Sequence, residues 1–204
     1  MSSLNILSFD IGIKNLAFCL FQYDLESSYI NFDIIEWDVI NLVLDGDKSL
    51  DHDTLFIELN ERFGDTKIDY IIIENQPAMK NPIMKTIQVM VYSYFKQMQL
   101  LHNKDILDVK MCNASNKIRY AKKLIPISEI ELKTPESNTY KRNKEAAIAY
   151  TLYLLNLNNK NDDISFFKTF KKKDDLADTL LQGLYFCSTL TSTSKTLLPT
   201  LSDT

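Results

Sequence analysis

Four carboxylates in this sequence stand at positions where they could bind a divalent metal ion. Asp10 follows a short apolar run, and Glu74 ends a second one. Asp175 and Asp178 are three residues apart in a segment of helical period, so both point from one face. A carboxylate at the end of a buried strand is costly in free energy unless something binds it. For Asp10 by itself, a side chain that caps its own turn is an open alternative.

The segments around these acids predict a mixed α/β sheet. Residues 6–21 contain two apolar runs separated by a short break at Gly12, which predicts a β-hairpin, and residues 30–40 predict a third strand. The β-branched run at residues 68–74 is typical of a buried parallel strand, and right-handed crossover places it beside the first strand. A further strand is expected at residues 106–111. Helices are expected at residues 82–102, 140–155 and 173–186.

This arrangement brings the four carboxylates toward one point. Asp10 and Glu74 would lie at the carboxyl ends of neighbouring strands, where open α/β sheets form their sites. Four converging carboxylates repel one another, and Mg²⁺ or Mn²⁺ relieves that repulsion. Two such ions, about 3.5–4 Å apart, support phosphodiester hydrolysis. The alternative for Asp175 and Asp178 is that they are favourable acids in the first turn of a helix.

Composition predicts one globular domain with an uneven charge distribution. The chain has 204 residues and a formal net charge of −4. Residues 24–69 hold 13 acidic and 3 basic side chains, whereas residues 70–204 hold 13 acidic and 19 basic ones. The basic part could face an anionic partner, although a solvated surface explains it equally well. We expect a domain at residues 1–190 and a frayed tail at residues 191–204.

Cysteine usage and hydropathy favour an intracellular protein. The three cysteines, at positions 19, 112 and 187, have unrelated spacings and apolar neighbours, so we expect reduced core residues. No apolar run reaches the ~18 residues of a membrane span. The N-terminus does not have the layout of a signal peptide, because Asp10 interrupts it.

Three motifs, taken in order, resemble a known family. They are S-F-D-I-G-I-K-N-L-A-F-C from residue 8, I-I-I-E-N-Q-P from residue 71, and K-K-D-D-L-A-D from residue 172. This set resembles the RuvC-type Holliday junction resolvases of the ribonuclease H-like superfamily, most closely the poxvirus resolvases and next the fungal mitochondrial ones. Bacterial members have proline after the first aspartate, where this chain has Ile11.

The resemblance implies a ribonuclease H-like fold with a mixed five-stranded sheet, and a Mg²⁺-dependent endodeoxyribonuclease that resolves four-way DNA junctions by paired symmetric cuts. It implies that Asp10, Glu74, Asp175 and Asp178 are both catalytic residues and metal ligands. It leaves open whether Asp174 contributes. It further implies a homodimer, branched DNA as the partner, a role in processing viral recombination or replication intermediates, and host cytoplasm as the location if the poxvirus likeness holds.

Basic and polar residues near the motifs are candidate DNA contacts. The candidates are Lys14, Gln76, Lys141, Arg142, Lys144, Lys172 and Lys173. Basic residues at the start of a helix oppose its macrodipole, so a phosphate partner would explain Lys141, Arg142 and Lys144, and a solvated helix end is the alternative. Lys172 and Lys173 could instead screen the neighbouring acids, and Gln76 could stabilise a turn.

Two other functions are open at this stage. A non-catalytic module that binds branched DNA would have the same fold, but we expect it to lack one of the four carboxylates. An actin-like or sugar-kinase-like ATPase would need a second domain and more glycine-rich loops than 4 glycines provide. The helix at residues 82–102 is apolar on most sides, so we expect it either to be central to the fold or to form a dimer contact.

Overall fold

The computed structural model describes residues 2–43, 50–77, 79, 81–102, 104–125, 130–135 and 137–190. The predicted tail at residues 191–204 lies outside this range. The strands are β1 (Ser3–Asp10), β2 (Leu16–Asp24), β3 (Phe32–Ile40), β4 (Tyr70–Glu74) and β5 (Asp108–Cys112). The helices are α1 (His52–Phe63), α2 (Pro82–Leu101), α3 (Ser115–Leu124), α4 (Thr139–Leu157), α5 (Asn161–Thr169) and α6 (Lys173–Leu190).

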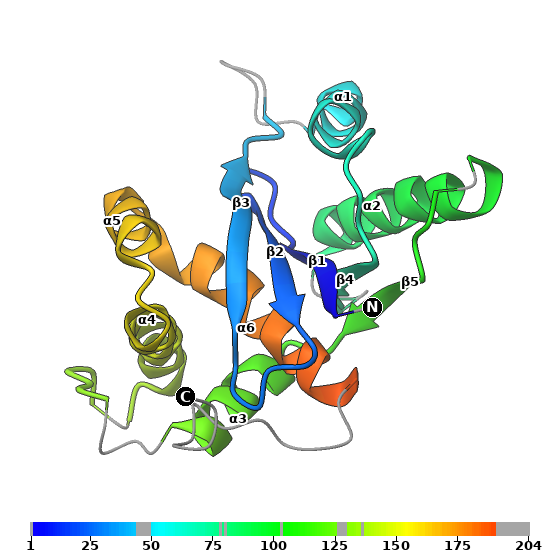
Figure 1. Ribbon diagram of the computed structural model, residues 1–204. Helices are drawn as coiled ribbons and strands as arrows, with labels where there is room; N and C mark the ends of the chain where they lie inside the picture. Colours follow the sequence, from blue (N-terminus) through cyan, green and yellow to red (C-terminus); the bar gives the residue numbers. More distant parts are fainter. Residues whose placement is uncertain are drawn as a thin grey trace.

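The five strands form one mixed sheet in the order β3-β2-β1-β4-β5 (Figure 1). β1 pairs with β2 and β2 with β3 in antiparallel fashion, as expected for sequential strands joined by short turns. β4 lies parallel to β1, and β5 lies parallel to β4, as expected for strands joined through helices. The predicted fold class, a mixed sheet with an antiparallel start, is therefore confirmed.

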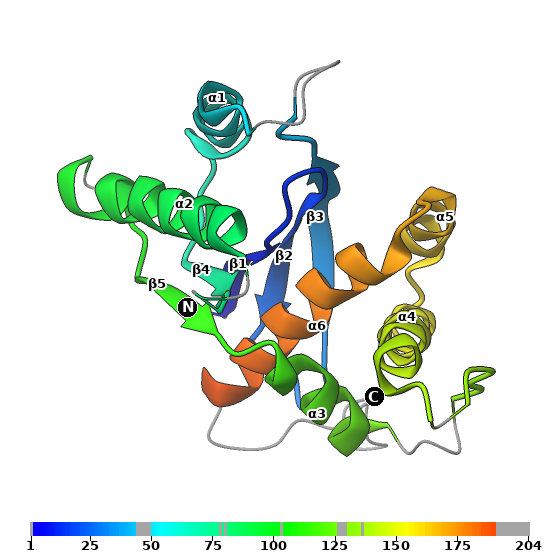
Figure 2. The ribbon, with the colours of Figure 1, turned by 180° about the vertical axis from the view of Figure 1, so that it is seen from behind.

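The two faces of the sheet carry separate apolar cores. α1 and α2 lie on one face, and α3 to α6 lie on the other (Figures 1 and 2). Side chains of β1 alternate between them: Leu7 and Phe9 belong to the core under α1 and α2, and Ile6 belongs to the core under α6. By this alternation Asp10 lies on the α6 side. In β4, Ile72 also faces α6, so Glu74 lies on that side too.

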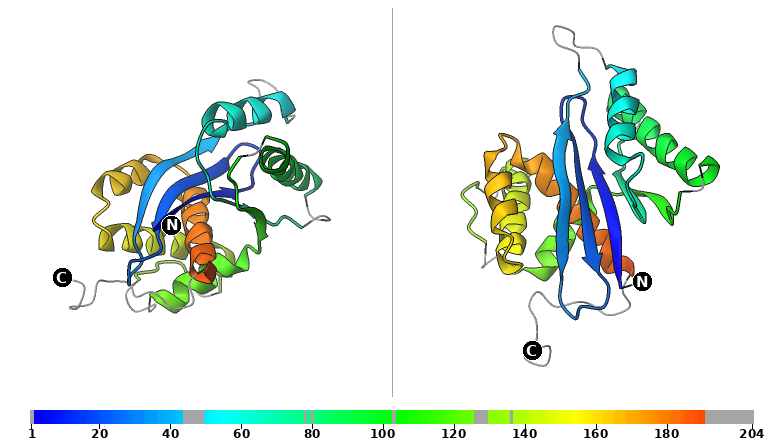
Figure 3. Two further views of the ribbon diagram at one scale, coloured as in Figure 1. Left: turned by 45° about the vertical axis from the view of Figure 1, so that its right-hand side comes forward. Right: turned by 45° about the horizontal axis from the view of Figure 1, so that its top comes forward.

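Helix α6 crosses one face of the sheet (Figure 3, left) and packs closely against β1 and β2. Gly183 makes this approach possible, because a Cβ at that position would lie 2.5 Å from the ring of Phe21. Trp37 of β3 donates a hydrogen bond of 3.1 Å from Nε1 to the carbonyl of Leu176. These contacts fix the register of α6, and with it the position of Asp178, against the sheet.

Helix α5 lies in a stretch for which we predicted no element; its Phe167 stacks on Trp37 with ring centroids 5.0 Å apart. In α2, Met84, Met90 and Tyr94 pack partly against the core under that helix. The helix therefore contributes to the core of one chain, which is one of the two roles predicted for it. Among the described helices, none is both long and apolar enough to cross a membrane.

Candidate active site

The ends of two parallel strands place the first pair of carboxylates. Phe9 of β1 pairs with Ile73 of β4, so the next residues, Asp10 and Glu74, leave the sheet side by side. Both side chains lie on the face covered by α6, which contributes Asp178 from its second turn. The carboxyl edge of the sheet therefore gathers acids from three elements that are distant in the sequence.

Lys117, in the first turn of α3, lies at the centre of these acids. Its Nζ is 2.5 Å from Oδ2 of Asp178, 3.6 Å from Oδ1 of Asp10 and 3.7 Å from Oε1 of Glu74. Its side chain is only 7% exposed. Burial alone lowers the pKa of Lys117, but the three carboxylates outweigh burial and raise the pKa above its ordinary value. Lys117 is therefore a fixed positive charge.

One buried ammonium does not balance the acids around it. Burial raises the pKa of Asp10 well above its ordinary value despite the opposing charge of Lys117, and Glu74 adds to the shift. Burial and the neighbouring charge of Asp10 also raise the pKa of Asp178 to about 6. For Asp175, burial and the charges of Asp174 and Asp10 raise the pKa to about 6. Ionisation of these acids is therefore unfavourable in the buried site, and another cation would make it more favourable.

The four predicted acids do not occupy equivalent places. Asp10, Glu74 and Asp178 surround Lys117, whereas Asp175 lies at the margin, where its nearest described cation is Lys172 at 3.9 Å. The carboxylate of Asp174 accepts a hydrogen bond from Lys144 of α4. Asp174 is thus engaged with α4 and not with the central cluster.

The carboxylate oxygens of the cluster suit a divalent cation, but the acids are arranged around the ammonium group of Lys117. Within the described residues, no three acidic, histidine or cysteine side chains stand close enough to hold one metal ion. Carboxylate oxygens are the ligands that Mg²⁺ and Mn²⁺ prefer. A cation bound by Asp10, Glu74 and Asp178 would replace contacts that these acids now make with Lys117.

Gln182 links the three elements that carry the acids. It lies one turn after Asp178 and is 1% exposed. Its Nε2 donates to the hydroxyl of Ser8 and to the carbonyl of Phe9, each at 3.1 Å, and lies 3.4 Å from the carbonyl of Ile72. One amide therefore holds α6 against the ends of β1 and β4, next to Asp10 and Glu74.

On the face of the sheet opposite α6, Gln88 anchors the backbone that follows β4. This buried side chain of α2 accepts a 2.7 Å hydrogen bond from the backbone amide of Gln76, just after Glu74. Its Nε2 also contacts the sulfur of Met111 on β5. The backbone that follows β4 is thereby anchored to α2, which holds the end of the strand in place.

The predicted DNA contacts fall into two groups. Lys14, in the β1–β2 turn, and Lys172, before α6, are exposed, as is Lys141 in α4. Lys172 also lies 3.9 Å from Asp175. Three of the other candidates make closer side-chain contacts: Lys144 binds Asp174, Arg142 donates to the carbonyl of Thr134 at 2.7 Å, and Lys173 donates to the carbonyl of Phe170. Gln76 donates its backbone N–H to Gln88.

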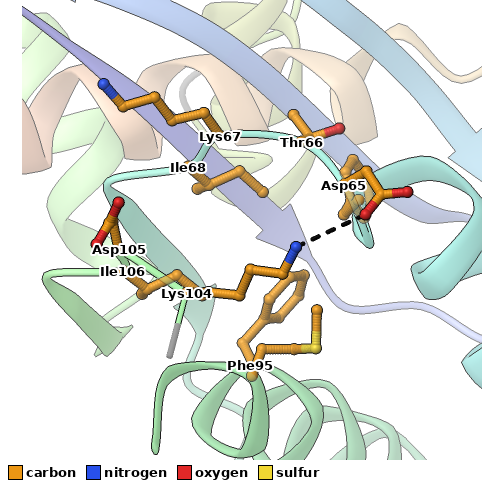
Figure 4. Close-up of a pocket in the computed structure, with 10 residues that line it drawn as sticks. Asp65, Thr66, Lys67, Ile68, Phe95, Lys104, Asp105 and Ile106 are labelled. Carbon is orange, nitrogen blue, oxygen red and sulfur yellow. Dashed lines mark ion pairs between the residues drawn. The ribbon is translucent and has the colours of Figure 1, made fainter. Parts of the chain in front are cut away.

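A cavity lies away from the cluster of Asp10, Glu74 and Asp178. It has a volume of about 300 Å³ and lies at the ends of β4 and β5 opposite the acids. Figure 4 shows its lining, in which Lys104 Nζ approaches Oδ1 of Asp65 at 3.7 Å beside the ring of Phe95. None of these three residues belongs to the acid cluster.

Comparison with solved structures identifies the fold. Fowlpox virus resolvase, solved with its substrate Holliday junction DNA, is 20% identical, with a TM-score of 0.59 over 91% of this chain and 98% of that one. The yeast mitochondrial Holliday junction resolvase is 18% identical, with a TM-score of 0.61 over 89% and 78%. Thermus thermophilus RuvC with Holliday junction substrate is 11% identical, with a TM-score of 0.52 over 94% and 98%. The chain therefore has the RuvC-type, ribonuclease H-like resolvase fold, as its motifs predicted.

Sequence comparison adds a viral relative. An uncharacterized protein of Acanthamoeba polyphaga mimivirus is 35% identical over 132 residues. The matched part is 63% of this chain and 31% of the relative, so the chain spans about a third of that protein's length. No protein-family model matches the chain.

Lys117 is the site residue that the sequence interpretation did not assign. The sequence after the strand expected at residues 106–111 predicts a basic helix, in which Lys117 is one of several basic residues. A signal was nevertheless present: a helix that starts directly after a parallel strand begins at the carboxyl edge of the sheet, where Asp10 and Glu74 were expected. The first turn of α3 was thus a candidate from topology alone.

Proposed function

We propose that this chain is a metal-dependent endodeoxyribonuclease that cuts branched DNA, chiefly four-way junctions. The observation that carries the proposal is the meeting of Asp10, Glu74 and Asp178 around Lys117 at the carboxyl edge of the sheet. Solved proteins of the same fold include two in complex with Holliday junction DNA, which supports branched DNA as the substrate class.

Asp10, Glu74 and Asp178 would hold a divalent ion, with Asp175 as a further carboxylate at the margin. When bound, Mg²⁺ or Mn²⁺, as one ion or two, would supply a water nucleophile and stabilise negative charge on the phosphate. Burial is the main cause of the raised pKa values of Asp10, Asp175 and Asp178, and a divalent cation would stabilise their ionised forms. Lys117 would keep a positive charge beside the phosphate undergoing cleavage, because its carboxylate neighbours hold it protonated.

Resolution of a four-way junction requires two cuts, and a two-fold dimer would provide two matched sites from one gene product. We propose α2 as the dimer contact, since Ile83, Val89, Leu100 and Leu101 are exposed on it. We further propose a role in viral DNA recombination or in processing replication intermediates, in host cytoplasm. The support for this role is the likeness in fold to the fowlpox virus resolvase, and the mimivirus relative is itself a viral protein.

The test is cleavage of a labelled four-way junction by the purified chain, with Mg²⁺ or EDTA, beside a linear duplex of the same sequence. We expect paired nicks in the junction, dependence on the metal and no cutting of the duplex. Asp10→Asn and Glu74→Gln should bind the junction and fail to cut it, because DNA affinity comes mainly from phosphate contacts elsewhere. Asp174→Asn is the matched acidic control and should cut. Binding without cutting by the unmodified chain would support the non-catalytic module instead.

A further inference from the structure

A cavity of about 600 Å³ opens directly beside the acid cluster. It shares Glu74, Lys117 and Asp178 with that cluster, and its remaining walls come from α3 and from the first turns of α4. Pockets of about 300–1,000 Å³ hold groups the size of a small molecule. The cavity therefore has room for a nucleotide, and one end of it is the proposed cleavage site.

The far wall of the cavity combines cations with an exposed aromatic ring. Arg119 and Lys122 of α3 line it together with Tyr140 of α4. Tyr140 is 71% exposed, so a ligand in the cavity could reach its ring. The phosphates of a nucleotide attract the cations, and its base stacks on an aromatic ring. An apolar or an anionic small molecule would match only one of these two features.

Contacts within the chain hold Tyr140 in place. Lys144 Nζ lies 5.2 Å from the centroid of the Tyr140 ring, at a distance typical of a cation–π contact. The same ammonium donates to the carboxylate of Asp174 at the start of α6. The ring is thus connected through Lys144 to the helix that carries Asp178. A ring fixed in advance loses less conformational entropy when a base stacks on it.

We propose that this cavity accepts one unpaired nucleotide of the strand to be cut, with its base on Tyr140 and its phosphates beside Arg119 and Lys122. The inference rests on the proposed nuclease function and extends it to substrate selection. A base inside a duplex is stacked on both sides and cannot reach such a ring unless it is extruded, which costs a few kcal/mol. Nucleotides at a branch point have already lost part of this stacking. The cavity therefore selects the branch point over the duplex arms.

The test measures junction affinity by fluorescence anisotropy in EDTA, where no cleavage occurs. Junctions that carry a single abasic nucleotide at successive positions through the crossover are compared with the intact junction. For the unmodified chain, one position should lower affinity by about 5- to 150-fold, the range for loss of one base stacked on an aromatic ring. Tyr140→Leu should lower affinity for the intact junction by a similar factor and should show no further loss at that abasic position.

Two variants serve as controls. Tyr140→Phe keeps the ring and should retain the affinity of the unmodified chain. Phe166→Leu removes another exposed aromatic, 41% exposed on α5 and outside the cavity, and should also have no effect. Linear duplex should bind the Tyr140→Leu variant and the unmodified chain equally well. Thermal unfolding of each variant checks that the fold is retained.

The outcomes distinguish failure of the nucleotide-binding proposal from failure of the nuclease proposal. Equal losses of duplex and junction affinity in Tyr140→Leu, or independent effects of the abasic position and the variant, would overturn the nucleotide assignment while junction cleavage stands. A chain that never cuts, but shows the Tyr140-dependent abasic effect, would overturn the nuclease proposal and leave the nucleotide cavity in place. An affinity unchanged by Tyr140→Leu on every DNA would also overturn the assignment.

Discussion

Nζ of Lys117 lies 2.5 Å from Oδ2 of Asp178, and this contact joins α3 to α6 within the cluster of carboxylates. The ammonium is almost fully buried and has two further carboxylates, Asp10 and Glu74, within 3.7 Å. Without it, these acids would face one another in a region of low dielectric constant. Lys117 therefore contributes to the stability of the fold as well as to the charge of the site.

Replacing Lys117 by methionine should destabilise the metal-free protein. The loss should be roughly 3–5 kcal/mol in the free energy of unfolding, which is typical when one partner of a buried ionic group is removed. Mg²⁺ should recover part of this loss, since the cation would neutralise the same carboxylates. Urea unfolding at pH 7 in EDTA and in Mg²⁺ measures both effects.

Lys123→Met is the matched control, because Lys123 is an exposed lysine of the same helix. It should change stability by less than about 0.5 kcal/mol, as substitutions on an exposed surface usually do. If Lys117→Met unfolds in EDTA at the same urea concentration as the unmodified chain, Lys117 does not hold the acid cluster together.

The ionised side chain of Asp175 should lower the free energy of unfolding at neutral pH. Its folded-state pKa is raised to about 6, mainly by burial, so the folded chain binds its proton more tightly than the unfolded chain does. Stability from this group is therefore present at low pH and is lost as pH rises from about 4 through about 6. Asp175→Asn, which carries no charge, should raise the free energy of unfolding at pH 7 by roughly 1–3 kcal/mol.

Urea unfolding in EDTA at several pH values checks this sign. The advantage of Asp175→Asn over the unmodified chain should shrink below pH 6 and vanish well below pH 4, where the carboxyl group is protonated in both states. Asp162→Asn is the control, since Asp162 is an exposed acid in the first turn of α5. An advantage that is constant with pH would show that the gain has another cause.

Much of the site could be predicted from the sequence. The positions of the strand-end acids depend on the local apolar pattern and on the right-handed crossover between parallel strands. The apolar run of β4 and the right-handed crossover were sufficient to place Glu74 beside Asp10. Lys117, Gln182 and Gln88 could not be assigned from local pattern, since each acts through partners on other elements. Helix α5 was missed because its burial depends on Trp37, about 130 residues earlier in the chain.

Arg119 and Lys141 should each bind DNA phosphate. Lys144 is unsuitable for a charge-reversal test, because reversing its charge would also break its ion pair with Asp174. Arg119→Glu and Lys141→Glu should weaken junction binding, and each should reduce the slope of log affinity against log salt by about 0.9 for every phosphate that the variant no longer neutralises. Anisotropy titrations at four salt concentrations measure the slope.

Lys168→Glu is the control for this series, because Lys168 is exposed on α5, away from the cavity. It should leave the slope unchanged. A slope that falls equally in all three variants would mean that binding responds to net charge alone, and α3 and α4 would lose their assignment to the DNA face.

The exposed apolar side chains of α2 predict a dimer. Leu100 and Leu101 are each 70% exposed, and Val89 is 46% exposed on the same helix. Val89 and Leu100 are eleven residues, about three helical turns, apart, so they lie along the same side of α2. Exposed apolar groups that form one patch usually mark an interface. Val89→Glu would place a charge in that interface, and desolvation of an unpaired charge opposes association. Light scattering of the unmodified chain at micromolar concentration, with and without junction DNA, should give a dimer, whereas Val89→Glu should give a monomer.

The activity of Val89→Glu links assembly to the paired cuts. A monomer has one active site per junction, so it should produce single nicks where the dimer produces two, on a plasmid-borne junction that distinguishes nicked from linear product. Phe166→Glu introduces the same charge at an exposed apolar position on the other face of the sheet and should remain dimeric. If the unmodified chain scatters as a monomer both alone and on DNA, α2 is not a self-contact. Paired cutting would then require two chains that act independently on one junction.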